Sequence, residues 1–231
     1  MLAERRDLIS FLGWVVESAC DSYNVDMVKI DDITAYIPAC DEPLSADVGV
    51  IIGNKKTWIF DVGSSESALE EIHQIDCEKA IVISHFHPDH MGNLQKINCP
   101  EIYVGANTLR YSGKGTVVDS DLYIEDRVRL HLFPIPCCHA KGSLGLEVNE
   151  KYAFIGDATA PTTKAGKRVY NAQILFDEIK VIEGIRVPYV LQSHRMDTIY
   201  EKEQIVEYLK KIYERRQSNN PYIQCEDDIY A

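Results

Sequence analysis

Three histidines and an aspartate crowd into six residues directly after an apolar run, and this cluster constrains the chain more than any other feature. The run spans residues 80–83 and reads Ala-Ile-Val-Ile, which is typical of a buried strand. The six residues that begin at position 85 read His-Phe-His-Pro-Asp-His. That concentration of imidazole and carboxylate suits neither a core nor a turn, so it predicts a metal site at the end of a rigid strand.

Further side chains that can bind metal follow apolar segments elsewhere. His139 comes after Phe-Pro-Ile-Pro-Cys-Cys, Asp157 after Ala-Phe-Ile-Gly, and His194 after Val-Leu-Gln-Ser. Strands that end along one edge of a core bring distant residues to one point, so we expect these three to join the cluster. Five imidazoles and two carboxylates suit zinc, iron, manganese or cobalt. His73 and His131 lie in a predicted helix and strand without partners, and we expect both to be structural.

Composition excludes several classes of function. Lys and Arg number 24 against 36 Asp and Glu, a net charge of −12, which argues against a nucleic-acid binder. No apolar run reaches the roughly 18 to 20 residues of a membrane span. The seven cysteines are an odd number without a repeated spacing, so they predict no disulfide framework and a reducing, cytoplasmic location. The expected partner is a small-molecule substrate.

The chain is predicted to be a single domain over residues 1–231, with an N-terminal helical extension (1–28) and a polar tail (218–231). Apolar residues at helical intervals in the extension predict a helix over Leu2 to Ala19, which could cap the core or form a homodimer contact. Expected strands span 33–38, 48–53, 57–61, 80–84, 102–105, 128–134, 144–148, 152–156 and 189–192. Expected helices span 66–74, 174–184 and 201–217. This pattern fits either two β-layers flanked by helices or one mixed sheet covered on both faces.

The histidine cluster resembles the HxHxDH motif of the metallo-β-lactamase-fold hydrolase superfamily. The later motifs of that family are matched by His139 in HAKGS, Asp157 in FIGDA and His194 in QSH. Upstream, the segment Ile-Phe-Asp-Val-Gly is similar to the family's D-x-G strand end, which places Asp61 behind the metal ligands as their support. The motifs follow the family's order from about residue 30 to 195.

This resemblance implies an α/β (α+β) fold, a four-layer αββα sandwich with a dinuclear site at one edge of the two sheets. It assigns His85, His87 and His139 to the first metal. Asp89, His90 and His194 would bind the second metal, and Asp157 would bridge both. Three imidazoles leave an open position on the first ion, as a catalytic zinc requires.

The function implied is that of a dinuclear metal-dependent hydrolase, with two divalent ions, zinc first and iron or manganese as alternatives. A metal-bridging hydroxide would attack an ester, thioester, lactone or phosphodiester bond, with Asp89 as the catalytic residue that orients it. Asp at position 157 disfavours a dedicated β-lactamase, because several antibiotic-degrading members place Cys there.

The loop expected over residues 159–171 carries a local positive cluster in an acidic protein. One interpretation is a solvated loop; the other is a cover over the metals that meets an anionic substrate through Lys164, Lys167 and Arg168, with Tyr170 as a hydrogen-bond donor.

Two other classes of function stay open. One is a di-iron oxidoreductase, although those sites tend to carry Glu where this chain has His87. The other is a non-catalytic metal-binding module that keeps the fold.

Overall fold

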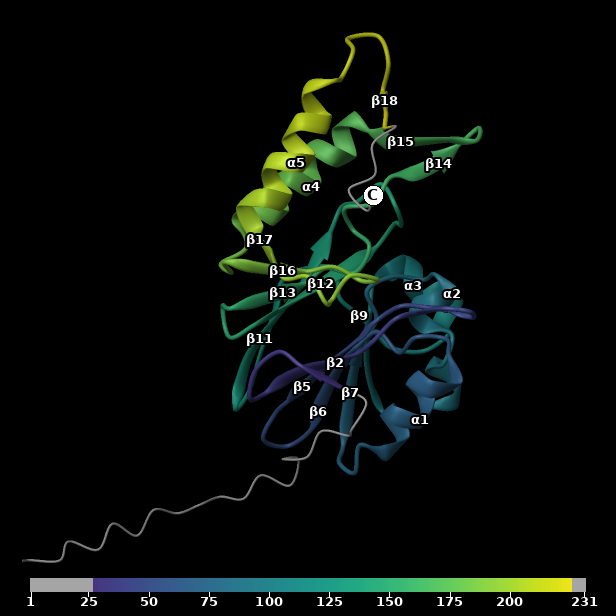
Figure 1. The fold of residues 1–231 in the computed structure, drawn as a ribbon, viewed down its shortest axis with the longest axis vertical. Coiled ribbons are helices and arrows are strands. Elements are labelled where there is room, and N and C mark those ends of the chain that lie inside the picture. Colours follow the sequence, from purple (N-terminus) through teal and green to yellow (C-terminus); the bar gives the residue numbers. More distant parts are fainter. Residues whose placement is uncertain (1–26, 226–231) are drawn as a thin grey trace, which may run out of the picture.

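Two mixed β-sheets face each other at the centre of the molecule (Figure 1). The structure is a computed structural model that describes residues 27–225. In spatial order, the first sheet contains β1 (Val28–Lys29), β2 (Thr34–Ile37), β5 (Val48–Ile52), β6 (Thr57–Phe60), β7 (Lys79–Val82), β8 (Glu101–Val104) and β9 (Thr116–Val117). The second sheet contains β10 (Leu122–Asp126), β11 (Val128–Ile135), β12 (Ser143–Val148), β13 (Tyr152–Phe154), β16 (Tyr189–Leu191) and β17 (Tyr200–Glu201).

Helices cover the outer face of each sheet and complete four layers. Against the first sheet lie α1 (Glu66–Gln74), α2 (Pro88–Met91), the 3₁₀ turn η1 (Leu94–Lys96) and α3 (Ala106–Ser112), and against the second lie α4 (Ala172–Gly184) and α5 (Lys202–Glu214). Between the sheets, Phe60 of β6 packs on Phe154 of β13 with ring centroids 5.5 Å apart. Burial of apolar side chains on both faces of both sheets fixes this order of layers. The predicted αββα sandwich is therefore confirmed.

The apolar periodicity predicted most of the elements correctly. Every strand expected between residues 33 and 192 is present, with bounds that shift by at most two residues, and the helix expected over 66–74 has those bounds. Ser65 caps that helix, because its hydroxyl accepts a hydrogen bond from the Ala68 N–H. The helix expected over Leu2 to Ala19 lies outside the described residues.

Two expectations need correction. Residues 159–171 are not a simple loop: most of them form a hairpin of β14 (Thr162–Lys164) and β15 (Lys167–Asn171) around a two-residue turn with positive φ. The segment 218–231 was expected to be only a polar tail, but within it β18 (Tyr222–Gln224) pairs with β15, and its Ile223 is buried. The pairing of β15 with β18 joins segments distant in sequence and leaves no local signal. The hairpin is local, and the glycine of its turn is the one signal that points to it. A second small hairpin consists of β3 (Cys40–Asp41) and β4 (Leu44–Ser45).

The described helices include none that combines the length and apolarity needed to cross a bilayer.

A buried carboxylate links the two sheets at the edge of the sandwich opposite the histidine cluster. Asp126 closes β10 of the second sheet, and its Oδ1 accepts hydrogen bonds from the Asn54 and Lys55 N–H groups in the β5–β6 turn, at 3.1 and 2.9 Å. Its Oδ2 accepts from Nε1 of Trp58, at 3.2 Å. Charged acceptors make stronger hydrogen bonds than neutral ones, so this side chain is a principal polar link between the sheets.

Asp126→Ala should lower the free energy of unfolding by about 3 kcal/mol, because three donors lose a buried acceptor at once. Urea unfolding followed by circular dichroism measures the change. Asp119→Ala, at an exposed position, is the control and should have a much smaller effect. Equal stabilities of the two variants would contradict this role of Asp126.

Candidate metal centre

Strand ends from both sheets meet at one edge of the sandwich and bring all seven predicted ligands together. In the first sheet, β7 leads into His85, and His87 begins the short helix α2 as its N-cap. In the second sheet, β13 leads into Asp157 and β16 leads into His194. His139 lies in the loop between β11 and β12. The seven residues form two groups, His85, His87 and His139 in the first and Asp89, His90, Asp157 and His194 in the second.

Three imidazoles converge in the first group. Nδ1 of His87 lies 3.0 Å from Nε2 of His85 and 2.9 Å from Nε2 of His139. A tetrahedral ion with bonds of about 2.0–2.2 Å separates its ligand atoms by roughly 3.3 Å, so this spacing fits a metal better than mutual hydrogen bonds between three neutral rings.

The second group combines imidazoles and carboxylates at similar spacings. Oδ2 of Asp89 lies 3.1 Å from Nε2 of His194 and 3.4 Å from Nε2 of His90. All ligand atoms of each group lie within 4.8 Å of one another. A mixed nitrogen and oxygen donor set suits divalent zinc, iron or manganese.

One carboxylate oxygen reaches both groups. Oδ2 of Asp157 lies 3.4 Å from Nε2 of His139 in the first group. The same atom lies 3.2 Å from Nε2 of His90 and 3.9 Å from Nε2 of His194 in the second group. Asp157 therefore occupies the position that a bridging ligand between two ions requires.

Asp61 lies behind the candidate ligands and contacts them both directly and through Ser84. Its Oδ2 accepts a hydrogen bond from Nδ1 of His90 at 2.8 Å and another from the Ser84 hydroxyl at 2.7 Å. Ser84 Oγ also lies 3.0 Å from Nδ1 of His85. With Nδ1 of both rings engaged in this way, Nε2 is the ring nitrogen that faces the centre. All four side chains are buried.

Sequence reasoning missed Ser84. Its only local signal is its position, as a polar residue that ends the apolar strand immediately before the motif. The contact with Asp61 depends on the parallel pairing of β6 and β7, which no local pattern specifies.

The backbone is unusual at three points around the centre. Asp61 and His194 both have φ of 62°, a left-handed conformation that side chains other than glycine rarely adopt. Gly156, just before Asp157, has φ of 58°, and a Cβ there would lie 2.7 Å from the Ser84 side chain. The strand end before Asp157 can therefore approach Ser84 only because residue 156 is glycine.

Burial and neighbouring charges divide the protonation states of the centre. Burial, with a further contribution from His90, holds the pKa of His85 far below its ordinary value, so this imidazole is neutral. Burial also lowers the pKa of His90, but the charges of Asp61 and Asp157 outweigh it and raise the pKa well above 6.5. Burial acts against the charged form of Asp89, yet the hydrogen bond with His194 brings the pKa of Asp89 down to about 2. Carboxylates and protonated imidazoles thus compensate one another in the second group.

The four residues predicted to contact substrate lie in the β14–β15 hairpin, which projects outward beside β18 in Figure 1. Nζ of Lys164 lies 3.7 Å from the ring centroid of Tyr222, and Nζ of Lys167 donates to Oε1 of Gln224. Arg168 follows Lys167 in β15, and its carbonyl oxygen accepts a hydrogen bond from the Cys225 N–H at 3.0 Å. Tyr170 is fully buried and its hydroxyl donates to the Thr159 carbonyl oxygen, so it offers no exposed donor to a substrate.

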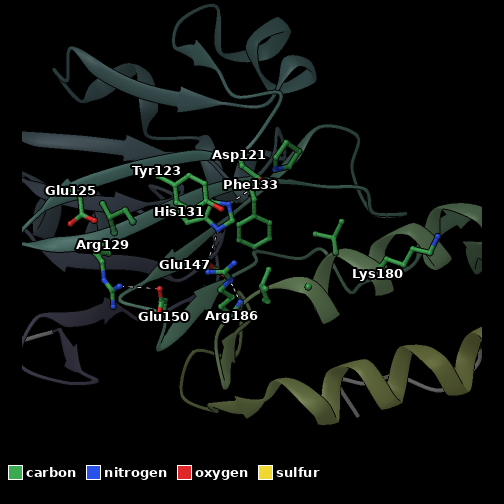
Figure 2. Close-up of a pocket in the computed structure, with 15 residues that line it drawn as sticks. Asp121, Tyr123, Glu125, Arg129, His131, Phe133, Glu147, Glu150, Lys180 and Arg186 are labelled. Atoms are coloured by element: carbon green, nitrogen blue, oxygen red, sulfur yellow. Dashed lines mark hydrogen bonds and ion pairs between the residues drawn. The ribbon is translucent and has the colours of Figure 1, made fainter.

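His131 has two partners, which contradicts the expectation that it has none (Figure 2). Its Nδ1 lies 2.8 Å from Oε2 of Glu147, and its Nε2 lies 3.2 Å from Oδ1 of Asp121. Tyr123 stacks on its ring, with centroids 4.3 Å apart. These residues line a cavity of about 500 Å³ between β10–β12 and the end of α4. Neither His131 nor the exposed His73 belongs to the two ligand groups.

Comparison with known proteins finds a match to part of the chain. Residues 41–98, which include the histidine cluster, match the model of the metallo-beta-lactamase superfamily. No curated protein sequence matches the chain.

Solved structures share the fold at low sequence identity. Rubredoxin oxygen:oxidoreductase from Desulfovibrio gigas superposes with a TM-score of 0.65 at 15% identity, over 84% of this chain but only 63% of that one. A structure of the chemotaxis sensor ODP described as a peroxy diiron species gives 0.60 at 16% identity, over 80% of this chain and 93% of that one. The metallo-beta-lactamase superfamily protein ST1585 from Sulfolobus tokodaii gives 0.54 at 20% identity, over 81% and 89%. The chain is therefore a metallo-β-lactamase-fold protein with a candidate site for two metal ions.

Proposed function

We propose that this protein is a dinuclear metal-dependent hydrolase that acts on an ester, thioester, lactone or phosphodiester bond of a small substrate. The observation that carries the proposal is the position of Asp157, whose one oxygen reaches imidazoles of both ligand groups. Three imidazoles in the first group leave an open position for water or substrate. The exposed side of the centre consists of partly buried ligands such as His194, so solvent reaches it.

Two divalent ions bound here, zinc in the first instance, would make a shared water available as hydroxide near neutral pH and polarise the bond under attack. The chain's own residues prepare the site for this reaction. Asp61 fixes the orientation of the His90 ring through Nδ1, and Ser84 does the same for His85. Asp89 is anionic, because His194 keeps its pKa at about 2, so its carboxylate can orient the nucleophile and accept its proton.

A second candidate function is a di-iron oxidoreductase. It is favoured by the names of the structural neighbours, which include an oxygen:oxidoreductase and a di-iron sensor. The first ligand group weighs against it, because three neutral imidazoles supply little negative charge to stabilise an oxidised iron pair. Oxygen consumption by the iron-loaded protein with a chemical reductant, without hydrolysis of any ester, would favour this second function.

Hydrolysis should depend on the bound metal. We expect the zinc-loaded or manganese-loaded protein to cleave at least one of p-nitrophenyl acetate, a thioester, a lactone and bis(p-nitrophenyl) phosphate. His87→Ala and Asp157→Ala should lose both metal and at least about 100-fold in rate, because each removes a ligand. Metal content by elemental analysis and release of p-nitrophenol measure the two effects.

His73→Ala is the matched control, since it removes an exposed imidazole outside the centre and should change neither quantity. Full activity of a preparation stripped of metal would reject the hydrolase proposal.

Metal uptake should release protons. Carboxylates raise the pKa of His90 well above 6.5, and the hydrogen bond with Asp89 raises that of His194, so a metal must displace protons from Nε2 of these rings. We expect proton release when the centre fills and an apparent affinity that rises with pH. Calorimetry in two buffers of different ionisation enthalpy counts the protons. His194→Ala should release fewer protons than the wild type, and an affinity independent of pH between 5.5 and 7.5 would contradict the scheme.

We extend the proposal to anionic substrates because Lys164, Lys167 and Arg168 share one hairpin in an acidic protein. Reversing two of these charges, with Lys167→Glu and Arg168→Glu, should raise KM several-fold for anionic substrates only, and less so at high salt. Steady-state kinetics on a charged and a neutral ester of the same alcohol measures the difference. Lys210→Glu with Lys211→Glu, on α5, is the control, and equal effects on both esters would count against this role.

A further inference from the structure

A buried hydrogen-bond chain connects the small sheet of β14, β15 and β18 to the candidate metal centre. It begins at Tyr170 in β15, whose hydroxyl donates to the backbone carbonyl oxygen of Thr159 at 2.7 Å. It continues from Oγ1 of Thr159, which donates to Oε1 of Gln192 at 3.0 Å. All three side chains are at most 1% exposed, so water does not compete for these bonds.

The chain ends beside two of the candidate ligands. Thr159 lies two residues after Asp157, and Gln192 lies two residues before His194. The same two loops are also joined by a backbone hydrogen bond from the Ser193 N–H to the Gly156 carbonyl, at 3.1 Å. The separation between Asp157 and His194 is therefore set by the parallel pairing of β13 with β16 and, beyond the strand ends, by these buried polar contacts.

Tyr170 is fixed by the elements on either side of it, β18 and the start of α4. In the register of the small sheet it pairs with Ile223 of β18, and both side chains are buried. Asn171, the next residue, caps α4 by accepting hydrogen bonds from the Gln173 and Ile174 N–H groups. A strand on one side and a helix start on the other leave the Tyr170 side chain little freedom to move.

We propose that Tyr170 is a positioning residue for the second ligand group. It fixes the turn that follows Asp157 and, through Thr159 and Gln192, the strand end that precedes His194. It acts on metal binding through these loops and touches neither ion nor substrate. This inference rests on the proposed dinuclear centre and assigns that centre a support that includes the C-terminal strand.

Tyr170→Phe tests the proposal because it removes only the hydroxyl and keeps the ring in the core. Asp157 and His194 both belong to the second group, whereas the first group shares with this turn only the Asp157 oxygen and the contact of His139 with the Pro161 backbone. We expect the affinity for the second ion to fall about tenfold, the lower end of what loss of a ligand's supporting contact costs, with a smaller change for the first ion. Thr159→Val, which removes Oγ1 and keeps the carbonyl, should also lower the affinity for the second ion.

The measurements are calorimetric titration of the metal-stripped protein with zinc and the visible spectrum of the cobalt-loaded protein, which reports ligand geometry. Tyr103→Phe is the matched control: its hydroxyl donates to Oε1 of Glu101 at 2.9 Å, in β8 of the other sheet. It should leave both zinc affinities and the cobalt spectrum unchanged, whatever it does to thermal stability.

Two results would overturn the proposal: wild-type affinities and cobalt spectrum in Tyr170→Phe, or equal losses in Tyr170→Phe and Tyr103→Phe. Failure of the hydrolase proposal is distinguishable, because the metal affinities and the cobalt spectrum are measured without any hydrolysis. A wild-type protein that binds no second ion would reject both proposals.

Discussion

The contact between Asp157 and His90 joins the two halves of the molecule at the site. Asp157 comes from the second sheet and His90 from the helix that follows β7 of the first, and their side-chain atoms lie 3.2 Å apart in a largely buried position. Each charge lacks an adequate solvent shell there, so each depends on the other or on a metal ion. This ion pair therefore belongs both to the contact between the two halves of the molecule and to the candidate metal centre. Asp61 contacts the opposite edge of the same imidazole.

The arrangement of charges suits an exchange of protons for metal ions. Burial among other imidazoles lowers the pKa of His85, whereas the carboxylates that face His90 and His194 raise the pKa of both. Metal binding would replace protons with metal ions, so each carboxylate would keep a positive partner throughout. Asp61 and His194 both have positive φ. A strained backbone of this kind is retained where the direction of the side chain matters for function.

Much of the site was predictable, because strand ends carry its residues and strands have a recognisable apolar pattern. The run over residues 80–83 led correctly to the cluster that follows it, and Asp157 and His194 followed from the same reasoning. The support residues were harder to predict. Ser84 meets Asp61 only because β6 pairs with β7. Tyr170 belongs to a basic segment in the sequence, and neither its burial nor the pairing of β15 with β18 is visible there. The substrate-contact prediction for Tyr170 failed for that reason: its hydroxyl is buried on a backbone carbonyl.

The sequence by itself determined which side chains are available as ligands, because a metal selects imidazole and carboxylate by their chemistry, and which segments form strands, because apolar alternation is local. Only the tertiary structure decided which oxygen faces both ligand groups, which ring nitrogen faces the centre and which distant strand pairs with the strand of Tyr170. Those properties depend on the pairing of strands and the packing of two sheets, and contacts between residues far apart in the chain leave no mark on the pattern of either one.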